Sequence, residues 1–257
     1  FQAEDGIRDP LWSRGLGDVY KRQLMQSKIR IAKYIANAGY CSRRDAEKLI
    51  EDRLVKINDQ LCVHPSDTVT EKDKITVGKK IIKLNQTIKL WKIYKPIKYI
   101  CSTKDEHNRK KIFDLIPKNL PRTISIGRLD FMSEGLLLLT NNGDFARKLE
   151  LPAKGYERIY RVCLRGQIDV KNLEQINNGI KIDGIFYKKI KIKIDKSNKN
   201  FTWLIVKLKE GKNREIRNIC KHFSWHIVKL IRIQYGPYKL GQLKEGQIEE
   251  INIKTNA

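Results

Sequence analysis

The sequence predicts an α+β protein of two units. The first is a small unit of two helices and a β-hairpin, and the second is larger, with a mixed and mainly antiparallel sheet. Apolar residues recur at helical spacing between residues 28 and 53, and short alternating runs follow them. Beyond residue 90, strand and helix patterns are interleaved without the regular alternation of a parallel doubly wound sheet. With 257 residues, 40% of them apolar, the chain is long enough for two packed cores.

Two short helices in tandem are predicted to open the small unit. The apolar positions of the first helix recur at helical spacing, at Ile31, Tyr34, Ile35 and Ala38. Gly39 stands where a left-handed C-terminal cap is expected. Ser42 and Asp45 have the spacing of a capping box, which predicts that a second helix begins there.

The outer face of this second helix is predicted to carry a cluster of cations, namely Arg43, Arg44, Lys48 and Arg53. Such charges usually form a solvated face. Here they gather at one helix start, where guanidinium groups and backbone N–H groups can bind phosphates together. We therefore take the four residues as candidates for nucleic-acid binding.

Short strands complete the small unit. Residues 54–63 are predicted to form two strands around an Asn58-Asp59 turn, and residues 73–77 add another. The polar, basic stretch 81–89 is predicted to be a linker, so the units are expected at 24–80 and 90–257. Residues 1–23 carry no net charge and no apolar period, and are predicted to be extraneous or disordered.

The larger unit is predicted to begin with a strand at residues 90–95, which Pro96 ends. Four consecutive leucines, Leu136–Leu139, must be buried. Further strands are predicted at 158–164, 189–194 and 201–207, and helices at 144–150, 170–177 and 213–222.

The composition narrows the range of partners. Lys plus Arg number 53 against 29 Asp plus Glu, a formal net charge of +24, which favours a polyanionic partner. Part of the lysine excess also fits a compositional bias. No run approaches the roughly 18 apolar residues of a membrane span, so no membrane partner is predicted. Five cysteines without a Cys-x-x-Cys pair favour reduced thiols in the cytoplasm over a disulfide framework or a metal site.

One carboxylate is a candidate for chemistry. Asp130 follows Gly127-Arg128-Leu129 on a predicted short loop, just before the buried leucine run. A charge held against a core is costly unless it is paired. From the residues alone, a catalytic carboxylate and an ordinary turn aspartate remain equally open.

The segment around Asp130 resembles the catalytic motif of the ribosomal RNA pseudouridine synthases. The likeness is to the branch that carries, in front, a small RNA-binding domain named after the fourth protein of the ribosomal small subunit. It covers nearly all of residues 28–251. Its blocks are Ala38–Arg44, Val55–Asn58, Gly127–Gly143, Tyr94–Pro96, Tyr99–Thr103, Phe113–Pro117, Leu151–Gly155, Gly179–Gly184, Glu210–Arg217 and Tyr235–Gly241. Met132 departs from the pattern, which has a small polar residue there.

The resemblance implies an enzyme, an isomerase that converts uridine to pseudouridine in ribosomal RNA, with the large-subunit type most similar. Such enzymes detach uracil from its ribose, rotate it and rejoin it through a carbon, without a cofactor. By resemblance, Asp130 is the catalytic carboxylate, Arg217 its cationic partner and Tyr160 the residue that stacks on the target base. Whether Asp130 forms a covalent adduct or takes a ribose proton is left open.

Three further cations, Arg128, Lys212 and Arg214, flank these motifs and are candidates for phosphate contacts around a flipped nucleotide. The expected partner is ribosomal RNA, alone or in a pre-ribosomal particle, and the protein is expected to be a cytoplasmic monomer without cofactor or metal. One alternative is a non-catalytic ribosome-binding or assembly factor that keeps the fold. Another is an RNA methyltransferase with the same front domain, which predicts a Gly-rich methyl-donor loop that the sequence lacks.

Overall fold

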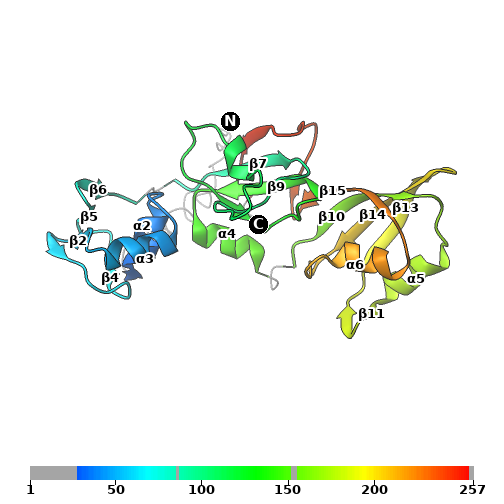
Figure 1. The fold of residues 1–257 in the computed structure, drawn as a ribbon, viewed down its shortest axis with the longest axis horizontal. Coiled ribbons are helices and arrows are strands. Elements are labelled where there is room, and N and C mark those ends of the chain that lie inside the picture. The colour runs from blue at the N-terminus through cyan, green and yellow to red at the C-terminus, as the bar shows by residue number, and fades with distance from the viewer. Residues whose placement is uncertain (1–27, 85–86, 152–154, 255–257) are drawn as a thin grey trace, which may run out of the picture. The chain divides into compact units, whose positions relative to one another are not determined.

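The computed structural model describes residues 28–84, 87–151 and 155–254 (Figure 1). The prediction for residues 1–23 therefore lies outside the described residues, as does the middle of the Leu151–Gly155 block. The chain divides into two compact units between residues 86 and 87, and each is described by itself.

The two predicted helices of the first unit are present. Helix α2 (Ile31–Asn37) ends just before Gly39, whose φ of +78° is the left-handed conformation expected of it. Helix α3 (Arg43–Glu51) begins after Ser42, and the Ser42 Oγ accepts a 3.1 Å hydrogen bond from the backbone N–H of Asp45. The Asp45 carboxylate in turn accepts a 2.6 Å hydrogen bond from the Ser42 hydroxyl. The helices pack on each other through buried isoleucines and alanines.

Short antiparallel strands cover these helices. Strands β3 (Gln60–Leu61), β2 (Val55–Ile57), β5 (Ile75–Val77) and β6 (Lys80–Ile82) form one sheet, in that order, and β1 (Ile29–Arg30) pairs with β4 (Thr68–Val69). Asn58 and Asp59 both have positive φ, as a tight turn between two strands requires. The linker expected at 81–89 is too long, because residues 81 and 82 belong to strand β6 of the first unit. Gly78, with φ of +59°, reverses the chain, and Ile82 enters the core of this unit at 5% exposure.

The second unit is built on a nine-stranded sheet. Its main path runs β13 (Lys191–Ser197), β14 (Phe201–Leu208), β10 (Arg158–Arg165), β15 (Ile227–Tyr235), β9 (Glu134–Thr140), β7 (Leu90–Lys95) and β17 (Ile248–Ile251). Strand β8 (Ile124–Ile126) pairs with β9, and β16 (Tyr238–Lys239) with β15. Every pair in this sheet is antiparallel except β15 with β9, so the predicted mixed, mainly antiparallel sheet is confirmed.

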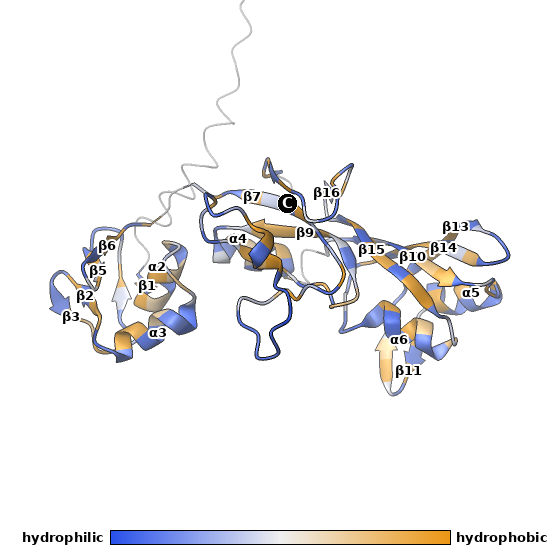
Figure 2. Cartoon of the chain, turned by 45° about the horizontal axis from the view of Figure 1, so that its top comes forward, coloured by the Kyte–Doolittle hydropathy of each residue, from blue (hydrophilic) through white to orange (hydrophobic). Residues whose placement is uncertain are grey.

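Helices lie against this sheet, and a β-hairpin packs beside one of them. The elements are η1 (Ile112–Leu115), α4 (Gly143–Glu150), α5 (Lys171–Asn178), the hairpin β11 (Ile180–Ile182) and β12 (Ile185–Tyr187), and α6 (Glu215–His222). Helices α5 and α6 lie on one side of β10 and β14 (Figure 1), over a core of aliphatic side chains. Figure 2 shows that α4 and α6 carry hydrophobic and hydrophilic residues on different faces, as helices that cover a sheet should.

The expected helix at 213–222 begins two residues later, at Glu215. Arg214 has a left-handed backbone, with φ of +52°, which interrupts helical geometry. The buried Glu215 carboxylate accepts hydrogen bonds from the backbone N–H groups of Gly211 (2.9 Å) and Lys212 (2.8 Å). These contacts fix residues 211–214 as a loop at the helix start. The expected strand at 189–194 is likewise displaced, to 191–197.

The parallel contact of β9 with β15 brings the two halves of the sheet together. All seven residues of β9 are buried, including the predicted leucine run. Gly135 lies opposite Arg232 in the register. Its φ is +99°, and a Cβ there would lie 2.9 Å from the Arg232 backbone nitrogen. Glycine therefore permits a close backbone approach that a larger residue would prevent. The loop before β9 carries Asp130, so this contact also positions the candidate site.

Candidate active site

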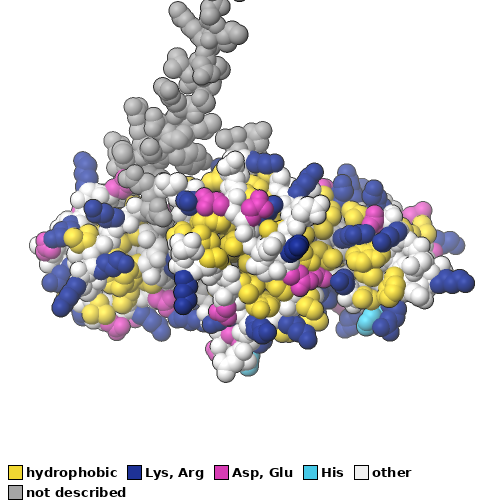
Figure 3. Space-filling model, turned by 90° about the horizontal axis from the view of Figure 1, so that it is seen from above, with side chains coloured by type: hydrophobic (Ala, Val, Ile, Leu, Met, Phe, Trp, Pro, Cys, Tyr) yellow, Lys and Arg dark blue, Asp and Glu magenta, His cyan; other side chains and the backbone are white. Residues whose placement is uncertain are grey.

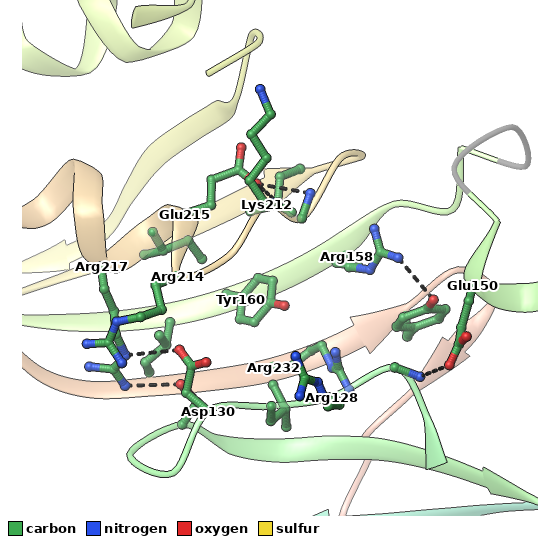
Figure 4. Close-up of a pocket in the computed structure, with 18 residues that line it drawn as sticks. Arg128, Asp130, Glu150, Arg158, Tyr160, Lys212, Arg214, Glu215, Arg217 and Arg232 are labelled. Carbon is green, nitrogen blue, oxygen red and sulfur yellow. Dashed lines mark hydrogen bonds and ion pairs between the residues drawn. The ribbon is translucent and has the colours of Figure 1, made fainter. Parts of the chain in front are cut away.

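A cavity of about 440 Å³ opens in the second unit, beside the start of β9. It is lined by residues from the loop before β9, from β10 and β15, and from the loop and first turn of α6 (Figure 4). Six of the candidates named from the sequence line it together: Arg128, Asp130, Tyr160, Lys212, Arg214 and Arg217. These residues are far apart in the chain, and the sheet brings them to one place.

Asp130 and Arg217 lie side by side in this cavity and point toward each other (Figure 4). The Arg217 Nε lies 3.5 Å from the Asp130 Oδ2, and the two side chains are 16% and 33% exposed. The Arg217 Nη2 donates hydrogen bonds to the carbonyl of Met132 (2.8 Å) and the Oγ of Ser133 (3.0 Å). Burial lowers the pKa of Arg217, and the Asp130 charge opposes this effect. The arginine thus holds both the carboxylate and the loop that carries it.

A buried lysine holds the same loop from the other side. Lys95 is fully buried, and its Nζ donates to the carbonyls of Pro96 (2.9 Å) and Ser133 (2.8 Å). Burial lowers the pKa of Lys95 to about 8. Our sequence reasoning did not place Lys95 in the site. The sequence feature that could have revealed Lys95 is the alternation of the strand at 90–95, which puts Lys95 on the same face as the buried Trp91 and Ile93.

Tyr160 lies on β10 in the middle of the cavity (Figure 4). In the register it is opposite Val206 of β14 and Arg232 of β15. The tyrosine is half-buried and packs against two apolar cores while it also lines the cavity. Its ring is therefore fixed by packing and still accessible to a ligand.

Two arginines that sequence reasoning missed also line the cavity. Arg158 donates from Nη1 to the carbonyl of Glu210 (2.7 Å), and its guanidinium lies 4.8 Å from the ring of Tyr235. Arg232 is only 2% exposed. Its signal in the sequence was weak, because β15 was not recognised as a strand and the inward register of Leu230 and Arg232 could not be assigned.

The mouth of the cavity is basic. Arg128 and Arg214 are exposed. Lys212 is partly engaged within the protein, since its Nζ donates to the carbonyl of Phe186 and lies 3.7 Å from the carboxylate of Glu210. Glu215 also lines the cavity. Burial raises the pKa of its carboxyl group, and the hydrogen bond from the Lys212 backbone N–H opposes this increase. An anionic ligand would meet mainly positive side chains at this entrance.

The four candidates of the first unit are not among the residues that line the cavity. Arg43, Arg44 and Lys48 are exposed on α3. Arg53 is exposed but lies beyond the end of α3, with a left-handed φ of +60°, and so does not continue the helical face as expected. Figure 3 shows Lys and Arg side chains spread over the whole visible face, with acidic groups between them. The net positive charge is therefore not confined to these clusters.

Within the described ranges, no helix is long and apolar enough to cross a membrane. In the same part of the chain, no group of three or more His, Cys, Asp or Glu side chains could hold a metal ion.

Two family models match the chain. Residues 89–222 match the model of RNA pseudouridylate synthase, and residues 29–75 match the S4 domain. An uncharacterized RNA pseudouridine synthase of Rickettsia felis is 48% identical over 225 residues, covering 88% of this chain and 97% of that protein. A ribosomal large subunit pseudouridine synthase B of Buchnera aphidicola subsp. Baizongia pistaciae is 37% identical, covering 80% of this chain and 86% of that protein.

A solved structure has the same fold. The crystal structure of a pseudouridylate synthase aligns with a TM-score of 0.63 and 24% sequence identity, over 87% of this chain and 96% of that one. The expected architecture, an S4 domain followed by a catalytic domain with a mainly antiparallel sheet, is therefore confirmed.

Proposed function

Because the chain belongs to the RNA pseudouridylate synthase family and is an RNA pseudouridine synthase, we propose that it isomerises one specific uridine of large-subunit ribosomal RNA. The observation that carries the proposal is the grouping of Asp130, Tyr160 and Arg217 in one cavity. The printed name of the Buchnera relative supports the choice of the large subunit. The substrate is ribosomal RNA, alone or in a pre-ribosomal particle.

The uridine must leave its stack to reach Asp130. Extrusion costs a few kcal/mol and is easiest in a loop or bulge. The cavity of about 440 Å³ has room for one nucleotide, and the Tyr160 ring offers an apolar surface on which the base can stack. Arg128, Lys212 and Arg214 at its mouth bind the phosphates around the flipped nucleotide.

Asp130 acts at the anomeric carbon of that nucleotide, as a nucleophile or as a base. The Arg217 guanidinium, 3.5 Å away, pairs with its carboxylate and holds it in place. A non-catalytic ribosome-binding factor would have no need for a carboxylate held in this way inside a cavity.

Modification mapping tests the proposal. The protein is incubated with ribosomal RNA transcribed in vitro, and pseudouridine is located by carbodiimide-dependent stops in primer extension. We expect one new stop, in the large-subunit RNA. An unchanged pattern on both RNAs would contradict the function, and a stop only in the small-subunit RNA would contradict the large-subunit assignment.

Replacing Arg43 and Arg44 together by alanine is expected to weaken RNA binding. Both side chains are exposed at the start of α3, where they can neutralise phosphates. Each lost phosphate contact should reduce the slope of log K against log salt by roughly one unit. Binding is measured by titration at several salt concentrations. The matched control replaces Lys72 and Lys74, which removes the same charge from another part of the unit, and an equal change in both double variants would count against the role of α3.

A further inference from the structure

Arg232 is the most buried cation of the cavity. Its exposed fraction is 2%, and it lies on β15 opposite Tyr160 and Gly135 in the register. The Nε donates a 2.7 Å hydrogen bond to the carbonyl of Leu136, and the guanidinium lies 5.2 Å from the ring centre of Tyr235. These contacts fix the direction of the side chain beneath the cavity.

One nitrogen of the Arg232 guanidinium is not satisfied by the protein. Among the described residues the Nη2 has no hydrogen-bond partner, and no carboxylate forms an ion pair with Arg232. The buried carboxylate of Glu134, on the adjacent strand, accepts a 2.9 Å hydrogen bond from the hydroxyl of Tyr94. A buried cation without a counter-ion is costly, and an unused buried donor requires an explanation. A purely structural role accounts for the Nε contact but leaves the Nη2 donor unexplained.

The position of Arg232 suggests what its unpaired N–H donors bind. It lines the cavity between Asp130 on one side and Arg158 on the other, below Tyr160 (Figure 4). A uracil that stacks on Tyr160, with its ribose at Asp130, would turn one edge toward this arginine. The polar groups along the edges of uracil are the N3–H donor and two carbonyl acceptors, and arginine has donors only.

The reaction gives this contact a chemical purpose. When the bond between N1 and the anomeric carbon breaks, its electron pair leaves with uracil and is shared with the two carbonyl oxygens. When the anomeric carbon rejoins at C5, that negative charge is consumed. The C5 proton then passes to a base and N1 takes up a proton, so the product is neutral and no proton is lost overall. A fixed cation next to a carbonyl oxygen stabilises the intermediate more than the starting nucleoside, which is the condition for a higher rate.

We propose that Arg232 donates a hydrogen bond to the uracil carbonyl oxygen that gains negative charge as the glycosidic bond breaks. The inference rests on the proposed function and adds a residue that stabilises the departing base. No proton is transferred by the arginine, which acts through its charge and its N–H donors.

The experiment pairs changes in the protein with changes in the substrate. Arg232→Met and Arg232→Lys are compared with the wild-type chain on a synthetic RNA hairpin whose target nucleotide is uridine, 2-thiouridine or 4-thiouridine. Sulfur accepts hydrogen bonds poorly, so it weakens a contact to the oxygen that it replaces. Single-turnover rates and RNA dissociation constants are measured for each pair.

We expect Arg232→Met to lower the single-turnover rate about 100-fold while RNA affinity changes less than threefold. The rate loss from one of the two thio substitutions should largely disappear in this variant, because the contact is already gone. Each protein serves as its own reference, so a partial loss of folded protein cancels from the comparison. Arg161→Met is the matched control, since Arg161 pairs with Asp195 and does not line the cavity.

Thio effects of unchanged size at both carbonyls in Arg232→Met would overturn the inference while leaving the function intact. A wild-type chain that forms no pseudouridine in any RNA would instead contradict the proposed function, and with it this role of Arg232.

Discussion

Asp130→Asn is expected to lower pseudouridine formation by about 10⁴-fold or more, the size of loss seen when an essential nucleophile or base is removed. The amide keeps the shape of the side chain and its place 3.5 Å from Arg217, but it can neither attack the anomeric carbon nor take a proton. Rejoining through C5 displaces the hydrogen at that carbon. The rate is therefore measured as tritium released from RNA that carries 5-tritiated uridine.

Binding should survive this change. The variant is expected to bind RNA about as tightly as the wild-type chain, because the cations at the cavity mouth are untouched. The matched control is Asp183→Asn, in the turn between β11 and β12, where a left-handed φ of +48° suits asparagine. It removes the same charge at a residue that does not line the cavity, and it should keep full activity. Wild-type rates in Asp130→Asn would show that another group performs the reaction.

The local elements were predictable because each follows from neighbouring residues. The Ser42 cap and the strand at 90–95, with its alternating burial, both depend on contacts within a few positions. The failures have the same cause. Residues 81 and 82 of strand β6 were assigned to the linker because the stretch that follows them is polar and basic, which masked the buried Ile82. The start of α6 was set by the backbone of Arg214, which no periodicity reveals.

The candidate site shows a different limit. Spacing alone could not pair Asp130 with Arg217, since their contact depends on β15 lying parallel to β9. The pair was predicted from the resemblance to a family, and that resemblance points only to residues within the family's motifs. Lys95 and Arg232 were missed because their signal is a charged residue at an inward position of a strand. For Arg232 that signal is readable only once β15 is known to be a strand, and for Lys95 only once the inward face of the predicted strand is known.

Replacing Lys95 by methionine is expected to slow the reaction by about 10² to 10³-fold with the fold retained. Lys95 does not line the cavity, and it acts by holding the carbonyl of Ser133, three residues after Asp130. A misplacement of about 1 Å in a reacting group can cost 10²-fold in rate. Single-turnover rates and a thermal melt are measured together. Lys92→Met, on the same strand and paired with Glu249 at 3.1 Å, is the control and should keep its activity.

The pH profile separates this positioning role from a merely structural one. Burial lowers the pKa of Lys95 to about 8, and the positive charge of Arg232 acts in the same direction. The charges of Cys101, Asp130 and Glu134 oppose this decrease. The ammonium is therefore present below pH 8 and lost above it, and the wild-type rate should fall as pH rises through about 8. Lys95→Arg keeps its charge throughout this range and should not show the step. A step of the same size in that variant would exclude Lys95 as its origin.

The same titration has the opposite effect on stability. In the unfolded chain a lysine holds its proton up to about pH 10.4, whereas folded Lys95 releases it near 8. Between these values the unfolded state binds more protons, so the free energy of unfolding rises with pH. Wild-type protein should therefore gain stability relative to Lys95→Met from pH 8 to 10, as measured by denaturant unfolding, while its activity declines. Activity and stability that change in the same direction over this range would contradict the assignment, because a general loss of folded structure would lower both.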